Sequence, residues 1–344
     1  MKHTKLCHDE RSFKPEIDRF SGAHDVFLVS LSSVSLVQGQ GHEVISTHAQ
    51  FHHPHIFPPH RGHGKRKDQT VNVYSSYSSE PAPMGLADYG IGPNGPYSRY
   101  ASEVIGVVNA SNVQVYASGN DCFSIQLNAV LTYNYQGQTY ALWAQDVASI
   151  NSNNLEFIDN VWNMSSPNAG VSVTGNGQVS STGGISFYYY CDTNTPGSPT
   201  QFSYPLNLEM MMTLSSDSQG PEVCFWYNEG QGWVKYDTVQ VSAPSAVPYF
   251  TIDGFNYTGS GNFYDLELDL VGPGGGSCAY VESAQVAFQL YYVNSTGTHE
   301  IGNTYNFGSD TGETSNNVVD QGYQNGYLYA ELTAGQGYLG CIWN

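Results

Sequence analysis

The sequence predicts an all-β protein whose antiparallel strands pack as a sandwich or jelly roll, with two packed β halves as one form of it. From about residue 80 onward, short segments rich in Val, Ile, Tyr, Phe and Thr alternate with Gly, Asn, Ser and Pro. No window of a dozen residues shows a helical period with capping residues at its ends. Strands that recur at this spacing are typical of antiparallel sheets.

Eleven segments of the body have the composition expected of strands. In order they are Glu103–Val115, Phe123–Tyr133, Thr139–Val147, Leu155–Trp162, Ile185–Tyr190, Leu206–Leu214, Glu222–Tyr227, Val234–Val241, Tyr264–Val271, Gln285–Val293 and Tyr327–Leu332. Residues 192–200 are rich in Thr, Pro and Ser, so we expect a long loop or a seam between two halves there.

The stretch 249–277 is the centre of the predicted fold. Within it, Asp265, Glu267 and Asp269 alternate with leucines at 266, 268 and 270, so acids and leucines fall on opposite faces of a strand. Three carboxylates in such a row repel one another unless some of them hold protons. Two interpretations follow: a solvated strand face, or a carboxyl site that works when largely protonated.

Charge divides the chain into a leader and a body. Residues 1–67 hold nine of the eleven Lys and Arg residues, six acids and ten of the eleven histidines. Residues 68–344 keep only Arg99 and Lys235 against 24 acids, a formal charge of −22. We therefore predict a largely unstructured leader over residues 1–79 and a catalytic β domain over residues 80–344.

The acidic body indicates the conditions and partners of the protein. Near pH 2–3 most carboxyls are neutral, since their reference pKa values are about 3.9 and 4.3, and the self-repulsion disappears. Salt adaptation is the competing explanation, but halophilic surfaces are far richer in charge than the 12% found here. Two basic residues cannot neutralise a phosphate backbone, which excludes nucleic-acid binding.

The leader contains two notable segments. Val26–Val37 is an apolar run too short to span a bilayer, so we expect a signal-peptide core and no stable membrane insertion. His52–His63 is rich in His and Pro without the fixed spacing of metal ligands, which favours a flexible, removable pro-segment over a metal site. Export to an acidic extracellular environment is the resulting expectation.

Cysteines and glycosylation sequons give little information about the function. The body has five cysteines and no C-x-x-C, so one or two disulfides would leave at least one thiol over. Four N-x-[ST] sequons begin at Asn109, Asn163, Asn256 and Asn294.

The chemistries that the body lacks narrow its function. Its only histidine is His299, and it contains no H-E-x-x-H, no phosphate loop and no dinucleotide motif. A catalytic site must therefore use carboxyls, amides, hydroxyls or backbone groups. Paired carboxyls suit acid hydrolysis, because one keeps its proton while the other activates water.

Six segments in order resemble the thermopsin family of exported acid endopeptidases from thermoacidophilic archaea. They are Pro81–Gly90, Phe123–Asn128, Leu142–Val147, Ile158–Ser165, Trp233–Val239 and the stretch from Tyr249 to Ser277. The resemblance implies peptide-bond hydrolysis in hot acid outside the cell, by an aspartic-type endopeptidase that needs no cofactor. It implies no particular catalytic pair. Asp146 stands where we expect Asn in the family, so we place no weight on it.

Three catalytic arrangements remain open. Asp310–Gly312 resembles the D-[ST]-G motif of pepsin-type enzymes, but those need two copies. A Glu and Gln pair, as in glutamic peptidases, would use Glu267 as general base and Gln145 as oxyanion donor. An Asp and Glu pair would be drawn from five acids. These are Asp265, Glu267, Asp159, Asp237 and Asp88.

The predicted substrate is an unfolded polypeptide held along a cleft by a monomeric enzyme. Trp143, Trp162 and Tyr264 are the candidate substrate-binding side chains, although aromatic residues in strands more often belong to a core. Two other functions stay open: a carbohydrate-binding or other non-catalytic surface sandwich, and a glycosidase with two suitably spaced carboxyls.

Overall fold

The computed structural model describes most of the body of the chain. The described residues are 84–117, 122–151, 154–164, 172–182, 185–192, 200–201, 203–257, 262–272, 279–301, 314–316, 318–324, 327–332 and 337–341. The predicted leader and the Asp310–Gly312 motif lie outside these ranges. Within them, no helix is long and apolar enough to cross a membrane.

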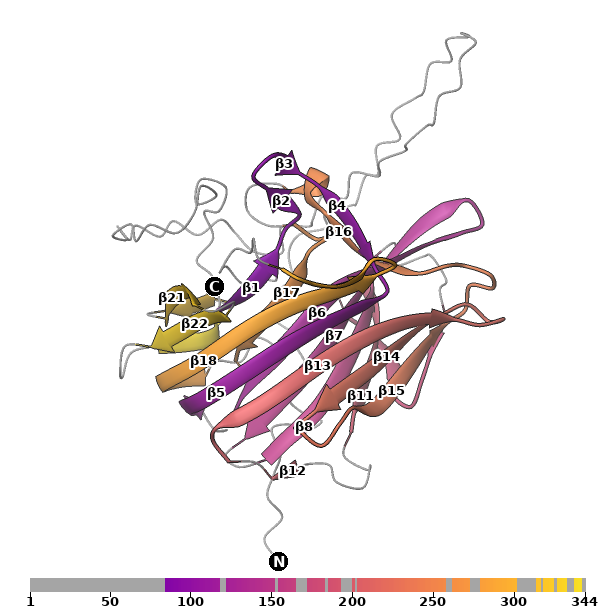
Figure 1. Cartoon of the computed structure of the whole chain (residues 1–344). Helices are drawn as coiled ribbons and strands as arrows, with labels where there is room; N and C mark the ends of the chain where they lie inside the picture. The colour runs from indigo at the N-terminus through magenta and orange to yellow at the C-terminus, as the bar shows by residue number, and fades with distance from the viewer. Residues whose placement is uncertain are drawn as a thin grey trace, which may run out of the picture.

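The first of two large antiparallel sheets has ten strands. Its main path runs in the order β1 (Met84–Asp88), β17 (Leu266–Val271), β6 (Cys122–Tyr135), β7 (Gln138–Asn151), β8 (Asn154–Asn163), β11 (Ile185–Cys191) and β10 (Gln178–Thr182). The remaining strands are β4 (Ser98–Ala101), β16 (Tyr249–Asp253) and β12 (Thr200–Gln201). In Figure 1 this sheet forms the rear layer.

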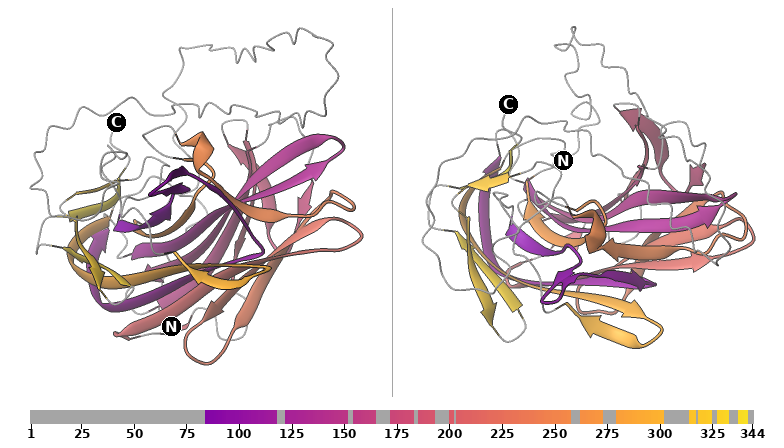
Figure 2. Two further views of the ribbon diagram at one scale, coloured as in Figure 1. Left: turned by 45° about the horizontal axis from the view of Figure 1, so that its top comes forward. Right: turned by 90° about the horizontal axis from the view of Figure 1, so that it is seen from above.

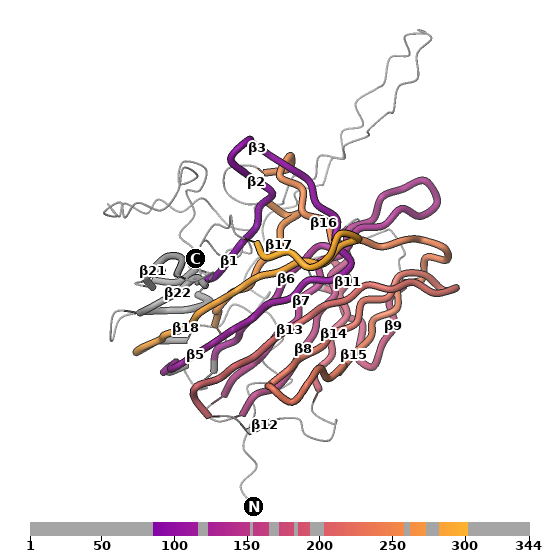
Figure 3. Tube along the Cα trace, in the orientation of Figure 1, coloured from indigo at the N-terminus to yellow at the C-terminus, as the bar shows by residue number. Residues whose placement is uncertain are grey.

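The second sheet has eleven strands and covers the first. Its main path runs in the order β20 (Thr314–Asn316), β23 (Gly337–Cys341), β18 (Ala279–Asn294), β5 (Glu103–Ala117), β13 (Leu206–Ser216), β14 (Pro221–Asn228), β15 (Val234–Val241) and β9 (Val173–Thr174). Off this path lie β19 (Gly297–Glu300), β21 (Val318–Gln324) and β22 (Tyr327–Leu332). Figure 2 shows the two sheets stacked as layers, and Figure 3 follows the chain through β5, β13, β14 and β15. A small hairpin of β2 (Ile91–Gly92) and β3 (Gly95–Pro96) stands apart.

Alternating side chains fill the space between the sheets. On β17 the leucines at 266, 268 and 270 all point into one continuous core. On β13, Leu206, Leu208, Met210 and Met212 are buried while the residues between them are not fully buried. The layers approach closely at Gly106, where an added Cβ would lie 2.6 Å from Leu268 Cδ1. The fold is thus a sandwich held by period-two alternation in both sheets.

The predicted fold class is confirmed, and a strand lies at each of the eleven expected segments. The main difference lies in the central stretch, where β16 and β17 are separate strands and Gly254–Asn256 forms a short 3₁₀ helix between them. In addition, β18 begins at Ala279, earlier than the expected Gln285. Its pairing with β5 is interrupted at Val281/Ser283 and Gln285/Val286, and such bulges break the alternation that marks a strand in sequence.

Candidate active site

A row of polar side chains crosses the outer face of the ten-stranded sheet. Strand register pairs Glu267 with Asn128, Asn128 with Gln145, and Gln145 with Asn160. Paired residues of neighbouring antiparallel strands point to the same face. Because the leucines of β17 point into the core, this row lies on the opposite face, as the alternation predicted.

The acids of β17 are buried. Glu267 is 1% exposed, Asp269 is 0% exposed, and Asp265 directly before the strand is 2% exposed. The interpretation of this segment as a solvated strand face is therefore wrong. When carboxyls are enclosed in this way, burial and neighbouring groups control their protonation.

Hydrogen bonds connect the row from one end to the other. The Trp162 indole Nε1–H donates to Gln145 Oε1 at 3.2 Å, and Gln145 Nε2 donates to Asn128 Oδ1 at 3.2 Å. Asn128 Nδ2 then donates to Glu267 Oε2 at 3.3 Å. The structure thus brings together Glu267 and Gln145, the two residues of the predicted glutamic arrangement, through Asn128. Sequence analysis missed Asn128 as a functional residue, although it ends one of the family-like segments.

Aromatic side chains border the row. Trp162 stacks on Phe187, with ring centroids 4.3 Å apart, and Trp143 lies 6.5 Å from Trp162. Both tryptophans lie on the face of Gln145, since Trp143 pairs with Trp162 two residues along. Tyr264 packs edge-on against Phe263 instead, and none of the described ring contacts joins it to the two tryptophans.

The edge strand β1 pairs with β17 and leaves room for one of its acids. Gly85 pairs with Asp269, and a Cβ added at residue 85 would lie 2.1 Å from Asp269 Oδ1. Glycine at this position therefore leaves the space that the Asp269 carboxyl occupies. This gives a physical reason for the glycine in the family-like segment Pro81–Gly90.

A second group of acids lies between the two sheets. Asp146 and Asp159 pair across β7 and β8 on the core face, and both are 0% exposed. Asp237 reaches them from β15 of the other sheet and is 2% exposed. Register between β14 and β15 shifts at Phe225/Trp226, and this bulge lets both Tyr236 and Asp237 be buried.

Tyrosines hold these interior acids in place. The Tyr236 hydroxyl lies 2.7 Å from Asp146 Oδ1 and donates to the Ile158 carbonyl at 3.0 Å. Tyr188 donates to Asp237 Oδ2, and Asn176 Nδ2 donates to Asp237 Oδ1 at 2.8 Å. Both oxygens of Asp237 are therefore acceptors, so a proton shared with Asp159 belongs on Asp159.

Burial raises the pKa of Asp159 well above its ordinary value, and the neighbouring Asp237 and Asp146 raise it further. Burial also raises the pKa of Asp146 well above its ordinary value, although the hydrogen bond with Tyr236 opposes this. These two acids are therefore protonated under conditions in which exposed carboxyls are ionised. Sequence analysis placed no weight on Asp146 because Asn is expected there in the family, and no local feature of the sequence shows that it faces Asp159.

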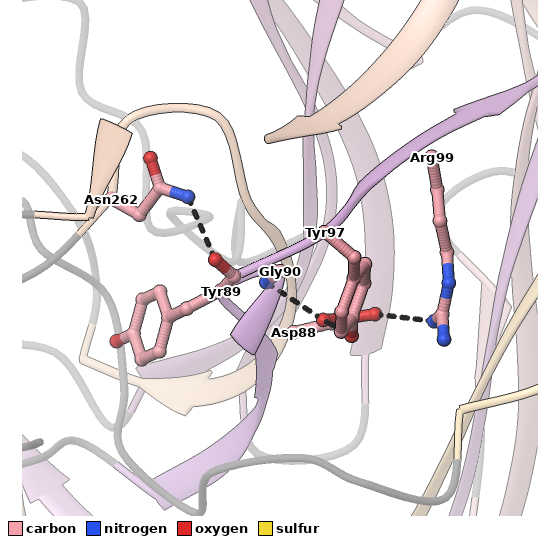
Figure 4. Close-up of polar contacts among 6 residues, drawn as sticks. All are labelled: Asp88, Tyr89, Gly90, Tyr97, Arg99 and Asn262. Carbon is pink, nitrogen blue, oxygen red and sulfur yellow. Dashed lines mark hydrogen bonds and ion pairs between the residues drawn. The ribbon is translucent and has the colours of Figure 1, made fainter. Parts of the chain in front are cut away.

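Asp88 is separate from both groups. It pairs with Leu266 and so lies on the core face, opposite Glu267. Arg99 Nη1 lies 2.9 Å from Asp88 Oδ2, while the Tyr97 hydroxyl and the Gly90 amide donate to Asp88 Oδ1 (Figure 4). Burial raises the pKa of Asp88, and Tyr97 and Arg99 oppose that rise. The arrangement indicates a structural ion pair.

Cysteine and metal chemistry are limited within the described residues. Cys191 and Cys224 are free thiols, and burial raises the pKa of Cys191. Across the same ranges, no group of three or more His, Cys, Asp or Glu side chains is arranged to hold a metal ion.

Comparison with known proteins gives the family. The thermopsin family model matches residues 69–318. The chain belongs to the thermopsin family. It is 34% identical over 268 residues to thermopsin of Sulfolobus acidocaldarius, a match that covers 72% of this chain and 79% of that protein. This membership confirms the resemblance seen in the six segments and supports assignment of the chain as a protease.

A solved structure also matches at low similarity. It is scytalido-glutamic peptidase with a transition state analog inhibitor, at 10% identity and a TM-score of 0.26, covering 74% of this chain and 99% of that one. At this TM-score the likeness carries no argument about the site.

Proposed function

We propose that this thermopsin-family chain is an acid endopeptidase in which Glu267 and Gln145 act on a polypeptide lying across the outer face of the ten-stranded sheet. The observation that carries the proposal is the row in which Glu267, Asn128 and Gln145 occupy three adjacent strands. Adjacent strands lie about 4.8 Å apart, so the backbones of β17 and β7 are about 9–10 Å apart here. A scissile peptide group fits between a carboxyl and an amide at this spacing.

The proposed reaction needs only side chains of this row. Glu267 takes a proton from a water molecule as the water oxygen bonds to the scissile carbonyl carbon. One Nε2–H of Gln145 exchanges its bond to Gln126 Oε1 for a bond to the carbonyl oxygen, which takes up negative charge. When the C–N bond breaks, the proton on Glu267 passes to the departing amine. One peptide bond and one water become an acid and an amine, and Glu267 returns to its starting state.

Acidic surroundings and export are part of the same proposal. They are supported by the formal charge of −22 over residues 68–344, which carries 24 acids against two bases. The interior acids also support them, because Asp146 and Asp159 have raised pKa values and are best accommodated when protonated.

The interior pair of Asp159 and Asp237 is the competing carboxyl arrangement. Both side chains lie between the sheets, at 0% and 2% exposed. A substrate peptide would have to part the sheets to reach them. Glu267 is also buried, at 1% exposed, but it lies on the opposite face of the sheet, where Gln145 is 8% exposed and both bordering tryptophans are half-buried. We therefore assign Asp159 and Asp237 a role in the stability of the fold and not in catalysis.

Digestion assays test the proposal. Purified protein should cleave casein or haemoglobin at pH 2–4, and Glu267→Gln should reduce cleavage by about 10³-fold or more, since it removes the only proposed base. Glu103→Gln, the same change on β5 of the other sheet, is the matched control and should keep full activity. Circular dichroism should show that both variants are folded.

The outcomes separate the alternatives. Full activity of Glu267→Gln would exclude that residue as the base. Failure of the wild-type protein to cleave either substrate, together with hydrolysis or binding of a polysaccharide, would favour the glycosidase or carbohydrate-binding interpretation.

A further inference from the structure

The polar row contains more than an acid and an amide, because its hydrogen bonds have a fixed direction. An indole N–H can only donate, so the bond from Trp162 requires that the Gln145 oxygen face it. The Gln145 NH₂ group must then point the other way, toward Asn128 Oδ1. This leaves the Asn128 NH₂ group to face Glu267 Oε2. One chemically unambiguous end thus determines the orientation of both amides.

A second set of contacts holds the Gln145 amide in the same orientation. The Ser124 hydroxyl donates to the Gly272 carbonyl at 2.8 Å and accepts from Gln126 Nε2 at 3.3 Å. Gln126 therefore turns its oxygen toward Gln145 Nε2, which donates to it at 3.2 Å. With Trp162, Gln126 and Asn128 around it, the Gln145 amide has one orientation that satisfies all its partners.

The two amides of the row differ in exposure. Asn128 is 0% exposed, while Gln145 is 8% exposed. The Trp162 ring is held from behind by its stack on Phe187, with an interplanar angle of 17°. The amide of Asn128 lies between Gln145 and Glu267, and the single indole N–H of Trp162 is directed at the Gln145 oxygen, so we assign both groups to positioning.

We propose that Trp162 and Asn128 are positioning residues for the reaction: Trp162 orients the Gln145 amide, and Asn128 orients Glu267 and favours its ionised form. This inference rests on the proposed function of Glu267 and Gln145. Burial of Glu267 and the acids Asp265 and Asp269 on the same strand face favour its protonated form. The donor on Asn128 opposes them, so Glu267 can serve as a base at lower pH than it could without Asn128. The device suits an acid enzyme, because its base must stay ionised in acid.

A pair of matched tryptophan variants tests the first half. Trp162→Phe removes the indole N–H and keeps a ring that can stack on Phe187. We expect kcat to fall about tenfold or more, the value of one lost hydrogen bond in the transition state, with KM changed less than about twofold. Trp226→Phe is the same chemical change on β14 of the other sheet, where the Trp226 indole N–H donates to Thr213 Oγ1 at 3.1 Å. It should change kcat less than about threefold.

The pH profile tests the second half. Asn128→Leu keeps the volume and removes the donor, so the acidic limb of kcat/KM should move to higher pH by about half a unit or more. A residue that merely fills space would lower activity without moving that limb. If Asn128→Leu does not fold, Asn128→Ala, which also removes the donor and adds no charge, gives the same test.

The results distinguish failure of this inference from failure of the proposed function. Equal losses in Trp162→Phe and Trp226→Phe, or an unmoved acidic limb in the Asn128 variants, would overturn the positioning roles while Glu267→Gln remained inactive. An active Glu267→Gln would instead remove the proposed function, and this inference with it.

Discussion

Two groups of buried carboxyls lie on opposite faces of one sheet, and their neighbours differ. On the outer face, Glu267 accepts from the amide of Asn128, within a row whose donors all point toward it. Between the sheets, Asp159 faces two more acids, Asp237 and Asp146. Amide donors stabilise a carboxylate, whereas acidic neighbours and burial stabilise the protonated form. Burial alone therefore does not assign a role to an acid, but its hydrogen-bond partners do.

The largest expected effect is on the free energy of unfolding and comes from the interior acids Asp146 and Asp159. Asp146 and Asp159 have folded-state pKa values raised above the ordinary 3.8, so the folded state holds more protons than the unfolded state as pH rises past about 4. The free energy of unfolding should therefore fall with rising pH, by up to about 1.4 kcal/mol per pH unit for each group until its folded pKa is reached.

Asp159→Asn, whose amide can still donate to Asp237, should remove one such contribution. We expect the unfolding free energy near pH 7 to rise by more than about 1.4 kcal/mol, the equivalent of one pKa unit, and to change by less than about 1 kcal/mol at pH 3. Denaturant unfolding at several pH values measures this, with digestion at pH 3 as the control that should be nearly unchanged. Loss of cleavage in a folded Asp159→Asn protein would contradict the assignment of Asp159 to stability. It would favour instead a catalytic pair of carboxyls that includes Asp159.

A somewhat smaller effect tests the third kind of buried acid, one that has a cation as its partner. Arg99→Leu leaves the Asp88 carboxyl, 0% exposed, without its ion pair. Removal of one partner of a buried pair should cost about 3 kcal/mol at neutral pH. At pH 3 the cost should be smaller, because Asp88 can then take a proton. Arg99→Lys, which keeps the charge, is the matched variant. An equal cost of Arg99→Leu at both pH values would contradict the ion-pair explanation.

The smallest effect concerns the tyrosines between the sheets. Tyr236→Phe removes the hydroxyl that contacts Asp146 and the Ile158 carbonyl. We expect a loss of about 1–2 kcal/mol in unfolding free energy at pH 3, as for one buried hydrogen bond, with little change in kcat. Tyr100→Phe, at a side chain that is 57% exposed, should have almost no effect on thermal unfolding. A change of similar size in both variants would show that the interior hydroxyl contributes nothing specific.

Much of the fold follows from local patterns. Period-two alternation predicted which face of the 266–270 segment enters the core, and strand composition predicted segments such as Leu206–Leu214 and Val234–Val241. Short strands such as β4 and β16 were not predicted, because a few residues carry too little pattern. Their pairing depends on partners far along the chain.

The site was predictable only in part for the same reason. Glu267 and Gln145 were identified by residue type and by likeness to a known chemistry, but Asn128, which joins them, is 139 residues from Glu267 in sequence. Only cross-strand register places it there. Asp146 and Asp237 likewise come to face Asp159 through strand pairing and a bulge between β14 and β15, features that no short motif specifies.

The acids enclosed between the layers have a thermodynamic consequence. Hydrogen ions act here as a stabilising ligand, with binding positions at Asp146 and Asp159 that tighten when the chain folds. As with any such ligand, the melting temperature should climb as the pH falls below the folded-state pKa values, and it should level off once the same carboxyls are also protonated in the unfolded chain, at about pH 4.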